Sequence, residues 1–446
     1  MKNIHASTLS NKKHLFNSID YIQVEVEITE NHYNLPLDSL FTIAARKNAK
    51  RSFLFISKVL GKHVPIHPKK GLLTSVLLAT RYYESYYGAK VEEKMEFISN
   101  FLNDNSAFSS ISFIPKKINP IIIGFAETAT ALGHAFFDCF TMADYVHTTR
   151  ESVPSQLPLI TFEEEHSHAT SHRCYISHEI LANNREIILV DDELTTGKTA
   201  LNIIRFIHSK FPRSVYTIVS ILDFRSSEDR EAFKEVEDSL QITIRVVCLL
   251  AGKMRVEQLK EEFQKNKFNQ KVHEIDTNVE ILSFSSIFQK ANYSPFLVET
   301  GRFGIQSTEK EGIHQKVNQV AEILSAKRSG ERTICLGTGE FMYIPMKIAA
   351  EMGPGVVYQS TTRSPIYIYD EETYGVRFGI TFPNPENHEI THFVYNIPQG
   401  RYDDLFIFFE KNVAPSELHS FLNELKKTKI KSIKVVSFSD GGVSLL

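Results

Sequence analysis

Two adjacent carboxylates, Asp191 and Asp192, stand at the end of the stretch of this chain that is richest in potential chemistry. The apolar residues 187–190 before them are rich in β-branched side chains and predict a buried strand. A turn of Thr and Gly comes next, and residues 200–210 then predict a helix. A strand, a turn and a helix in this order direct backbone N–H groups and the positive end of the helix dipole at one point, which suits a phosphate. The two carboxylates suit sugar hydroxyls or a divalent cation.

Two other interpretations of this stretch are open. Gly197-Lys198-Thr199 resembles the end of a Walker A loop, but that loop needs a Gly five residues before Gly197, where Asp192 stands. A nucleoside triphosphatase is therefore disfavoured. The plainest alternative is a strand with a polar end, followed by a helix with an N-capping Thr. Because the whole run fits a phosphate-binding turn, we favour the chemical interpretation.

A second strand–turn–helix pattern lies earlier in the chain. Residues 120–123 predict a strand and residues 131–140 a helix, and between them stand Gly124, Phe125, Ala126, Glu127, Thr128, Ala129 and Thr130. Small residues allow backbone amides to approach phosphate oxygens, although such a turn by itself is more often only a turn. Its place before the acidic strand favours a joint phosphate site. Strands that alternate with helices predict an α/β fold with a parallel sheet and helices on both faces.

Length and composition limit the classes of protein. A chain of 446 residues is too long for one core and suits two or three domains. The net charge of −3, with 23% charged residues, gives no support for nucleic-acid binding. No apolar run approaches a membrane span, and the polar first residues lack the core of a signal peptide. The four cysteines form no metal pattern and suit a reducing, cytoplasmic environment: Cys139, Cys174, Cys248 and Cys335.

The second half of the chain repeats the first in an ordered series of matches. An offset of 213 relates Gly337 to Gly124, Glu340 to Glu127, Tyr358 to Tyr145, and Thr361-Thr362-Arg363 to Thr148-Thr149-Arg150. An offset of 220 relates Ile380-Thr381-Phe382 to Ile160-Thr161-Phe162, and His388, His392 and Tyr395 to His168, His172 and Tyr175. An offset of 217 relates Val436, Ser437 and Asp440 to Val219, Ser220 and Asp223. Offsets that change only by short insertions indicate two homologous domains.

The second copy lacks the acidic turn. At the offset of 217, Asp191-Asp192 become Phe408-Phe409, and residues 195–199 become residues 412–416, so that only Glu410 keeps an acid. Phe cannot bind a ribose diol, and Pro415 within the turn removes an N–H donor. We therefore expect two parallel-sheet domains of the same fold in tandem, of which the second is degenerate.

These motifs resemble a known family. Residues 187–199 resemble the 5-phosphoribosyl-1-pyrophosphate (PRPP) signature of type I phosphoribosyltransferases, and the Gly124 turn resembles their pyrophosphate loop. The second half contains Thr362-Arg363-Ser364-Pro365, the motif that gives the TRSP domain its name. The combination resembles bacterial proteins in which a phosphoribosyltransferase-like domain precedes a TRSP domain, and which are associated with tellurite-resistance and stress gene clusters. Residues 51–55 and 59–63 also resemble the N-terminal part of that family.

The resemblance implies a role for each predicted site residue. Asp191 and Asp192 would hold the ribose hydroxyls and, mostly through the sugar or water, Mg²⁺. Arg150 would supply a cation to pyrophosphate, although its repeat at Arg363 favours a shared structural role as much. PRPP would also contact Glu193, Thr195, Thr196, Gly197, Lys198 and Thr199, and pyrophosphate would lie in the loop from Gly124 to Thr130. A second anion site is expected at Gly337, Thr338, Gly339, Glu340 and Arg363.

The roles of two features have more than one interpretation. Glu127 would repel pyrophosphate unless its carboxylate meets Mg²⁺ or a backbone amide. His166, His168 and His172 follow three glutamates and would share one face of a strand, which suggests zinc. Because His168 and His172 recur in the second half, a shared structural or loop role is the stronger hypothesis.

We expect three segments: a flank or hood over residues 1–117, a catalytic domain over 118–285, and a degenerate TRSP domain over 292–446. The expected function is that of a cytoplasmic phosphoribosyltransferase in a nucleotide-type biosynthetic or stress-response pathway. It would use PRPP or a related ribose-phosphate, with Mg²⁺, to make or break an N-glycosidic bond to a base-like acceptor. The alternative is a non-catalytic sensor of PRPP or nucleotides, or an interaction protein. A second copy of the chain and proteins of the same gene cluster are further candidate partners.

Overall fold

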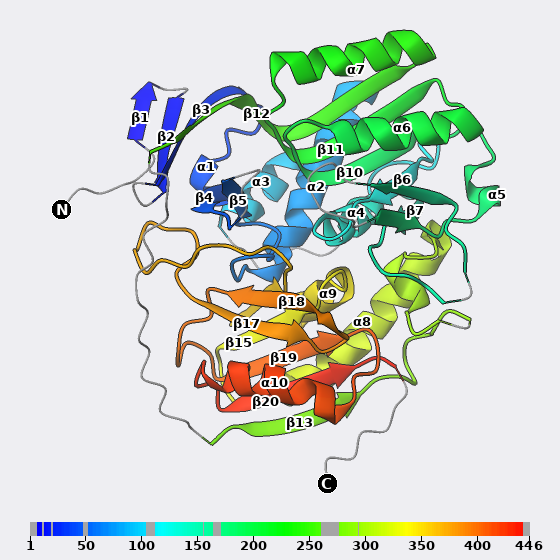
Figure 1. Cartoon of the computed structure of the whole chain (residues 1–446). Helices are drawn as coiled ribbons and strands as arrows, with labels where there is room; N and C mark the ends of the chain where they lie inside the picture. Colours follow the sequence, from blue (N-terminus) through cyan, green and yellow to red (C-terminus); the bar gives the residue numbers. More distant parts are fainter. Residues whose placement is uncertain are drawn as a thin grey trace.

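The computed structural model places two β-sheets one above the other, each with its own helices (Figure 1). It describes residues 7–10, 13–18, 21–47, 52–103, 112–154, 156–163, 171–259, 276–292 and 294–439. The first sheet lies in the upper part of the view and the second in the lower part. One hydrophobic cluster contains residues from both parts, such as Leu132 and Met346, so the two sheets share a core.

Among the residues that the structure describes, the first sheet has nine strands, and its centre is parallel. Its order is β1 (Ser7–Ser10), β2 (Lys13–Ser18), β3 (Ile22–Asn31), β12 (Thr243–Gln258), β11 (Val215–Asp223), β10 (Ile187–Leu194), β6 (Ile121–Gly124), β7 (Asp144–His147) and β14 (Ile305–Gln306). The strands from β12 to β7 run parallel, and β3 and β14 are antiparallel to their neighbours. The central strands are buried apolar runs, as a sheet covered on both faces requires.

Helices cover both faces of the first sheet. The longer ones are α2 (Pro68–Tyr87), α3 (Lys94–Leu102), α4 (Ala129–Asp138), α6 (Lys198–Lys210) and α7 (Ser227–Leu240), and the short ones are α1 (Leu37–Leu40) and α5 (His178–Leu181). Figure 1 shows α6 and α7 on the side of the sheet away from α2 and α4. Helix α6 is amphipathic, because its apolar residues recur on one face and are buried there: Ala200, Leu201, Ile203, Ile204 and Ile207. The predicted parallel sheet with helices on both faces is thus confirmed for this part of the chain.

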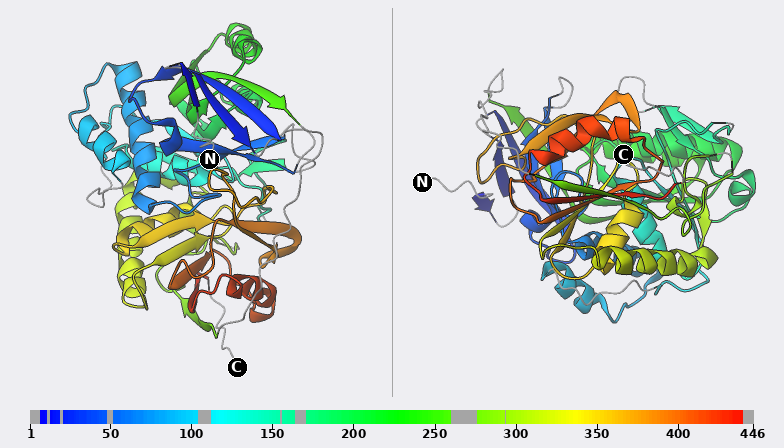
Figure 2. Two further views of the ribbon diagram at one scale, coloured as in Figure 1. Left: turned by 90° about the vertical axis from the view of Figure 1, so that its left-hand side faces the viewer. Right: turned by 90° about the horizontal axis from the view of Figure 1, so that it is seen from below.

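The second sheet has five parallel strands within the described ranges of the chain. Its order is β13 (Asn278–Ser283), β20 (Ser432–Ser437), β19 (Asp404–Phe409), β15 (Thr333–Gly337) and β16 (Val356–Ser360). Figure 2, in the view from below, shows α10 (Pro415–Lys426) on one side of this sheet, and α8 (Lys310–Ser325) and α9 (Tyr343–Glu351) on the other. Short 3₁₀ helices span Val298–Thr300 and Ser307–Glu309.

Four strands of each sheet follow the same order. The order β11-β10-β6-β7 in the first sheet corresponds to β20-β19-β15-β16 in the second, and the connecting helices α4 and α6 correspond to α9 and α10. A hairpin follows at the same point of each half: β8 (Ile160–Glu163) with β9 (Ser171–Cys174), and β17 (Gly379–Asn384) with β18 (Asn387–Tyr395). The edge strand differs, because β12 comes after this unit in the chain whereas β13 comes before it.

The two sheets exchange short strands across the expected boundary. Strand β13 lies within residues 118–285, expected as one domain, yet it pairs with β20 of the second sheet. Strand β14 lies within residues 292–446, yet it pairs with β7 of the first sheet. The chain therefore crosses between the two parts more than once, which spacing in the sequence did not predict.

The first 117 residues contact both parts. Strand β3 extends the first sheet beside β12, and α2 packs against both α4 and α9. The hairpin of β4 (Phe41–Ala45) and β5 (Phe53–Ser57) shares a buried cluster with the second half, in which Ala44 and Ile56 meet Ile366 and Val376. This segment is thus more than a flank of the first domain. Within the described ranges, no helix has both the length and the apolar character that crossing a membrane requires.

Candidate functional site

The predicted acidic turn and the predicted glycine turn begin side by side. Val190 of β10 pairs with Gly124 of β6. From these neighbours the chain turns in opposite directions, from β6 to β7 and from β10 to β11. Ligands of open α/β sheets bind outside the carboxyl ends of the strands at such a switch point. The structure therefore brings both predicted phosphate turns to the position where this class of fold binds ligands.

Strand β10 is longer than the sequence predicts. It continues past Val190 to Leu194, because β11 pairs with Asp191, Glu193 and Leu194 after β6 has ended at Gly124. The expected strand over 187–190 was therefore too short, since the pairing partner, and not the hydrophobic run, sets where the strand ends. The acids lie on a strand that has a sheet neighbour on one side only.

The turn into α6 requires glycine. Gly197 has a φ of +71°, and a Cβ placed there would lie 2.5 Å from the Phe233 ring. Helix α6 begins at Lys198, two residues before the expected start, so the first N–H groups of the helix belong to Lys198 and Thr199. Lys198 is exposed, and the side chains of the turn are half-buried: Thr195, Thr196 and Thr199. A phosphate placed here would meet the N-terminus of a 13-residue helix.

The carboxylates of Asp191 and Asp192 repel each other at close range. Asp191 Oδ1 accepts the N–H of Asp192 at 2.9 Å. Burial, followed by the negative charge of Asp192, raises the pKa of the Asp191 carboxyl well above its ordinary value. A bound cation would relieve both effects, so the pair fits Mg²⁺. In the described part of the chain no group of three His, Cys, Asp or Glu could hold a metal, so the remaining ligands would come from substrate or water.

The glycine turn is held by backbone hydrogen bonds. Phe125 N donates to Val190 O at 3.0 Å, and Ala126 N donates to Thr148 Oγ1 at 2.9 Å. The Ala126–Glu127 peptide bond is cis. A Cβ at Gly124 would lie 2.8 Å from Ala129 O, so the close turn excludes larger residues. Helix α4 begins at Ala129, two residues earlier than expected, and so contains the last two residues of the predicted loop.

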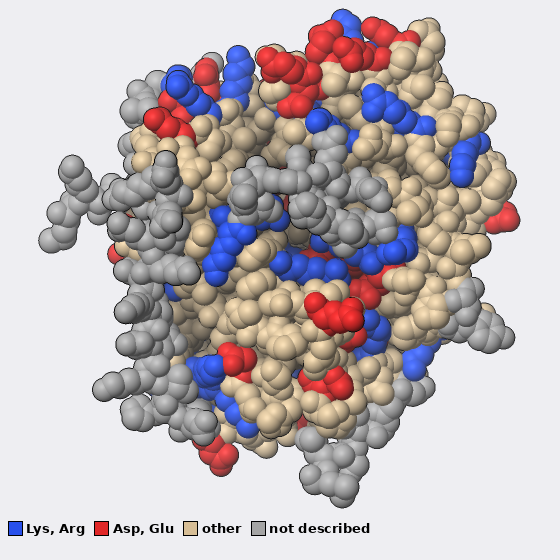
Figure 3. Space-filling view, viewed as in Figure 1, with Lys and Arg blue, Asp and Glu red and all other residues tan. Residues whose placement is uncertain are grey.

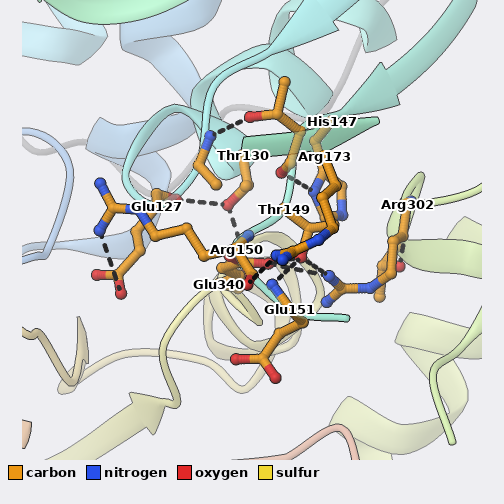
Figure 4. A network of polar contacts seen from close by, with 12 residues as sticks. Glu127, Thr130, His147, Thr149, Arg150, Glu151, Arg173, Arg302 and Glu340 are labelled. Atoms are coloured by element: carbon orange, nitrogen blue, oxygen red, sulfur yellow. Dashed lines mark hydrogen bonds and ion pairs between the residues drawn. The ribbon is translucent and has the colours of Figure 1, made fainter. Parts of the chain in front are cut away.

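Glu127 forms ion pairs and does not point at an open loop (Figure 4). Its carboxylate lies 2.8 Å from Lys62 Nζ, 2.9 Å from Arg363 Nε and 4.0 Å from an Arg150 nitrogen. Burial opposes ionisation, but Lys62, Arg363 and Arg150 outweigh it and hold the pKa of Glu127 below its ordinary value. Three cations therefore gather at the predicted pyrophosphate loop, one from each of three separate segments.

The equivalent glutamate of the second half is also buried and paired. Glu340 accepts hydrogen bonds from the Arg150 N–H at 2.7 Å, from Thr149 Oγ1 at 2.6 Å and from Arg302 at 2.9 Å (Figure 4). Arg302, 1% exposed, also pairs with Glu410 at 3.0 Å. The two glycine turns thus meet at the boundary between the sheets, and each glutamate binds groups from the other half.

Strand pairing corrects one predicted match by a single residue. Gly124 pairs with Val190, and its repeat Gly337 pairs with Phe408. Phe408 therefore takes the place of Val190, which puts Phe409 at the place of Asp191 and Glu410 at that of Asp192. The match of Asp191-Asp192 to Phe408-Phe409 was wrong, because the turn before the helix is one residue shorter in the second half. Helix α6 begins eight residues after Val190, whereas α10 begins seven residues after Phe408, so the offset changes within the turn.

Several hydrogen bonds recur at repeated positions. Ala126 N and Gly339 N each donate to a threonine Oγ1 at 2.9 Å, and each of these threonines lies 3.1 Å from a histidine Nδ1: Thr148 with His172, and Thr361 with His392. His172 thus has a hydrogen-bonding role that its repeat shares. His166 and His168 lie outside the described residues.

Some site residues carried no signal in the sequence. Lys62 lies in the segment 59–63 that resembles the family, but its spacing gave no hint of Glu127 as a partner. Arg302 follows no motif, and its partners Glu340 and Glu410 are distant in the chain. Of the predicted second anion site, Thr338, Gly339, Glu340 and Arg363 line one pocket.

Comparisons with known proteins agree with this geometry. Residues 40–253 match the family model described as phosphoribosyl transferase, and residues 299–425 match the model described as the TRSP domain that lies C-terminal to it. The chain therefore carries a phosphoribosyltransferase-family domain followed by a TRSP domain. No curated protein matches the chain.

Solved structures of adenine phosphoribosyltransferases match in part. The enzyme from Saccharomyces cerevisiae is 12% identical, with 48% of this chain and 96% of that chain covered and a TM-score of 0.28. The enzyme from Trypanosoma brucei, solved with AMP, pyrophosphate and ribose-5-phosphate, is 13% identical, with 35% and 64% covered and a TM-score of 0.23. The match thus spans less than two thirds of the T. brucei chain. At these TM-scores the similarity carries no argument about activity.

Proposed function

We propose that the turns at Gly124 and Gly197 bind PRPP or a related ribose-phosphate together with Mg²⁺. The chain would then transfer the phosphoribosyl group to a base-like acceptor, or break the N-glycosidic bond to such a base in the reverse reaction. The observation that carries this proposal is the pairing of Val190 with Gly124, which sets the acidic turn and the glycine turn at one switch point. The phosphoribosyltransferase family model over residues 40–253 supports it.

Each part of the site would serve a different part of the substrate. Residues 195–199 and the first amides of α6 would bind the 5′-phosphate, since they present N–H groups at a helix N-terminus. Asp191 and Asp192 would accept hydrogen bonds from the ribose hydroxyls. The transition state of glycosyl transfer has oxocarbenium character, which carboxylates stabilise while they orient the sugar. Mg²⁺ would neutralise the departing pyrophosphate.

The pyrophosphate group would bind beside Lys62, Arg150 and Arg363. These cations face Glu127, so bound pyrophosphate would either share them with its carboxylate or displace it. The pairing of these cations with Glu127 also favours a second candidate function, that of a sensor that binds nucleotides without turnover. In such a protein Glu127 would keep the cations neutralised.

We further propose that the second half is a diverged copy of the first that binds no PRPP. The shared strand order and the repeated hydrogen bonds of Thr148 and Thr361 support a common origin. Phe409 replaces an acid, and Glu410 is already bound by Arg302. Pro415 begins α10 and has no N–H to offer a phosphate.

The test is calorimetric titration with PRPP and Mg²⁺, followed by an assay of pyrophosphate release with a panel of bases. We expect the double variant Asp191→Asn, Asp192→Asn to lose PRPP binding, because each lost charge-assisted hydrogen bond costs about 1.5–3 kcal/mol. The matched control is Glu235→Gln with Asp238→Asn, which removes two exposed charges from α7. Unchanged PRPP affinity in a folded double variant would refute the site. Binding without pyrophosphate release would favour the sensor.

A further inference from the structure

A pocket opens at the switch point of the second sheet. Strand β15 leads to β16 on one side and β19 leads to β20 on the other, and the loops after β15 and β19 both line the pocket. We call it the interdomain pocket, lined by Glu151, Phe296, Arg302, Thr338, Gly339, Glu340, Phe341, Arg363, Asn384, Glu386, His392, Glu410 and Lys411.

One buried side chain in this pocket has an unused polar atom. His392 is 1% exposed, and its Nε2 has no hydrogen-bond partner among the described residues. Its Nδ1 lies 3.1 Å from Thr361 Oγ1, which already accepts the Gly339 N–H. When the Thr361 hydroxyl donates its proton to Nδ1, the ring proton of neutral His392 lies on Nε2. A buried donor without an acceptor is costly, so the structure calls for a ligand acceptor at this point.

The three cations of the pocket differ in how closely carboxylates hold them. Arg302 is bound by Glu340 and Glu410, and Arg363 by Glu127 and Glu151. Lys411 Nζ lies farther from its carboxylates, 3.5 Å from Glu151 and 3.9 Å from Glu386, and 5.1 Å from the centre of the Phe296 ring. Lys411 is therefore the cation of the pocket that can best take a new partner. Figure 3 shows the wider setting, a band of Lys and Arg side chains across the middle of this face.

Hydroxyl groups also have acceptors in the pocket. Glu386 Oε1 is buried and makes no hydrogen bond among the described residues. Burial raises the pKa of Glu386 to about 7, against the opposing effect of Lys411. The rings of Phe296 and Phe341 supply apolar walls beside these polar groups. The described residues contain no group of three ligands for a metal ion.

We propose that the interdomain pocket is a second ligand site, which takes a small sugar phosphate. Its phosphate would accept hydrogen bonds from His392 Nε2 and Lys411, and its hydroxyls would donate to Glu386. A diphosphate such as PRPP suits the pocket less, because its larger charge would meet the four carboxylates of the lining: Glu151, Glu340, Glu386 and Glu410. This site does not depend on turnover at Asp191 and Asp192.

The test uses the full chain with Asp191→Asn and Asp192→Asn, so that the first site is disabled. Calorimetric titration of this protein with ribose 5-phosphate should show one site. Adding Lys411→Met should weaken binding by about tenfold or more, a change of about 1.4 kcal/mol. The matched control is Lys327→Met, which removes an ion-paired lysine two residues after the end of α8 that does not line the pocket.

A second variant covers the case in which Lys411→Met does not fold. Glu386→Gln should weaken ribose 5-phosphate more than inorganic phosphate, because only the sugar offers hydroxyls to this side chain. The proposal is overturned if neither probe binds the disabled protein, or if both variants bind ribose 5-phosphate as tightly as their parent. Failure of PRPP to bind the unmodified chain would instead count against the proposed function, since that measurement probes the first site.

Discussion

The turns after β6 and β15 each carry a buried glutamate that binds cations, whereas the turns after β10 and β19 differ. Gly197 and the amides of α6 leave the first turn open to a phosphate, while α10 starts with Pro415 and follows a buried Glu410. The acid at the place of Asp192 has become a partner of Arg302. The same position thus holds a proposed substrate-binding acid, Asp192, in the first half. In the second half it holds Glu410, which forms an ion pair with Arg302 where the two sheets meet.

The largest effect should come from the cation that joins the two halves. Arg302→Met leaves Glu340 and Glu410 buried without their partner, so the free energy of unfolding should fall by about 3–5 kcal/mol. Thermal unfolding measures this loss. Arg332→Met, which removes an exposed ion pair with Asp403, should change the melting temperature little. Equal effects of the two variants would contradict the role given to Arg302.

The open turn can be tested through its glycine. Gly197→Ala places a methyl group 2.5 Å from Phe233 at a positive φ, so we expect a loss of about 2–4 kcal/mol of stability and weaker PRPP binding. Gly400→Ala is the matched control, because its φ is +67° but a Cβ would meet nothing within 4 Å. It should cost about 1 kcal/mol, the conformational effect alone. Calorimetry and thermal unfolding of both variants separate strain from steric overlap.

The stability of the chain should depend on pH through Glu386, which lies in the second half. The pKa of Glu386 is raised to about 7 by burial, with Glu151 and Glu410 adding to it and Lys411 opposing. The folded chain therefore holds this proton more tightly than the unfolded chain, and the resulting stability is lost as the pH rises from about 4.5 to 7. Glu386→Gln removes this loss, so its stability relative to the parent should rise by about 1–3 kcal/mol between pH 5 and pH 8. Denaturant titrations at both pH values give the difference. A constant difference would place Glu386 in contact with solvent.

The smallest predicted effects compare two equivalent tyrosines. Tyr175 Oη accepts the Val153 N–H at 2.9 Å, and Tyr395 Oη accepts the Ile366 N–H at 2.9 Å. Tyr395 also donates to Ser364 O at 2.8 Å. Tyr175→Phe should therefore cost about 1 kcal/mol and Tyr395→Phe somewhat more, about 2 kcal/mol. Thermal unfolding of both variants checks which loss of stability is larger. A larger loss for Tyr175→Phe would contradict the hydrogen bonding given to the two tyrosines.

Local features of the site could be predicted from the sequence, and contacts between distant segments could not. The acidic turn, the glycine turns and the repeat follow from residue types at fixed short spacings. The pairs of Lys62 with Glu127 and of Arg302 with Glu410 depend on how two sheets pack, for which spacing carries no information. The position equivalent to Asp192 was misplaced by one residue because the turn between strand and helix is one residue shorter in the second half. Only strand register reveals that change.

The position of β13 has a consequence for the synthesis of the chain. This strand leaves the ribosome about 150 residues before its partner β20, which at about 5–20 residues per second means a wait of roughly 10–30 s. During that time its hydrogen-bonding groups lack their native partner, because β20 has not yet been made. A nascent chain that has completed the first sheet still carries one unpaired strand destined for the second. The appearance of β20 is therefore the event that lets the edge of the second sheet form.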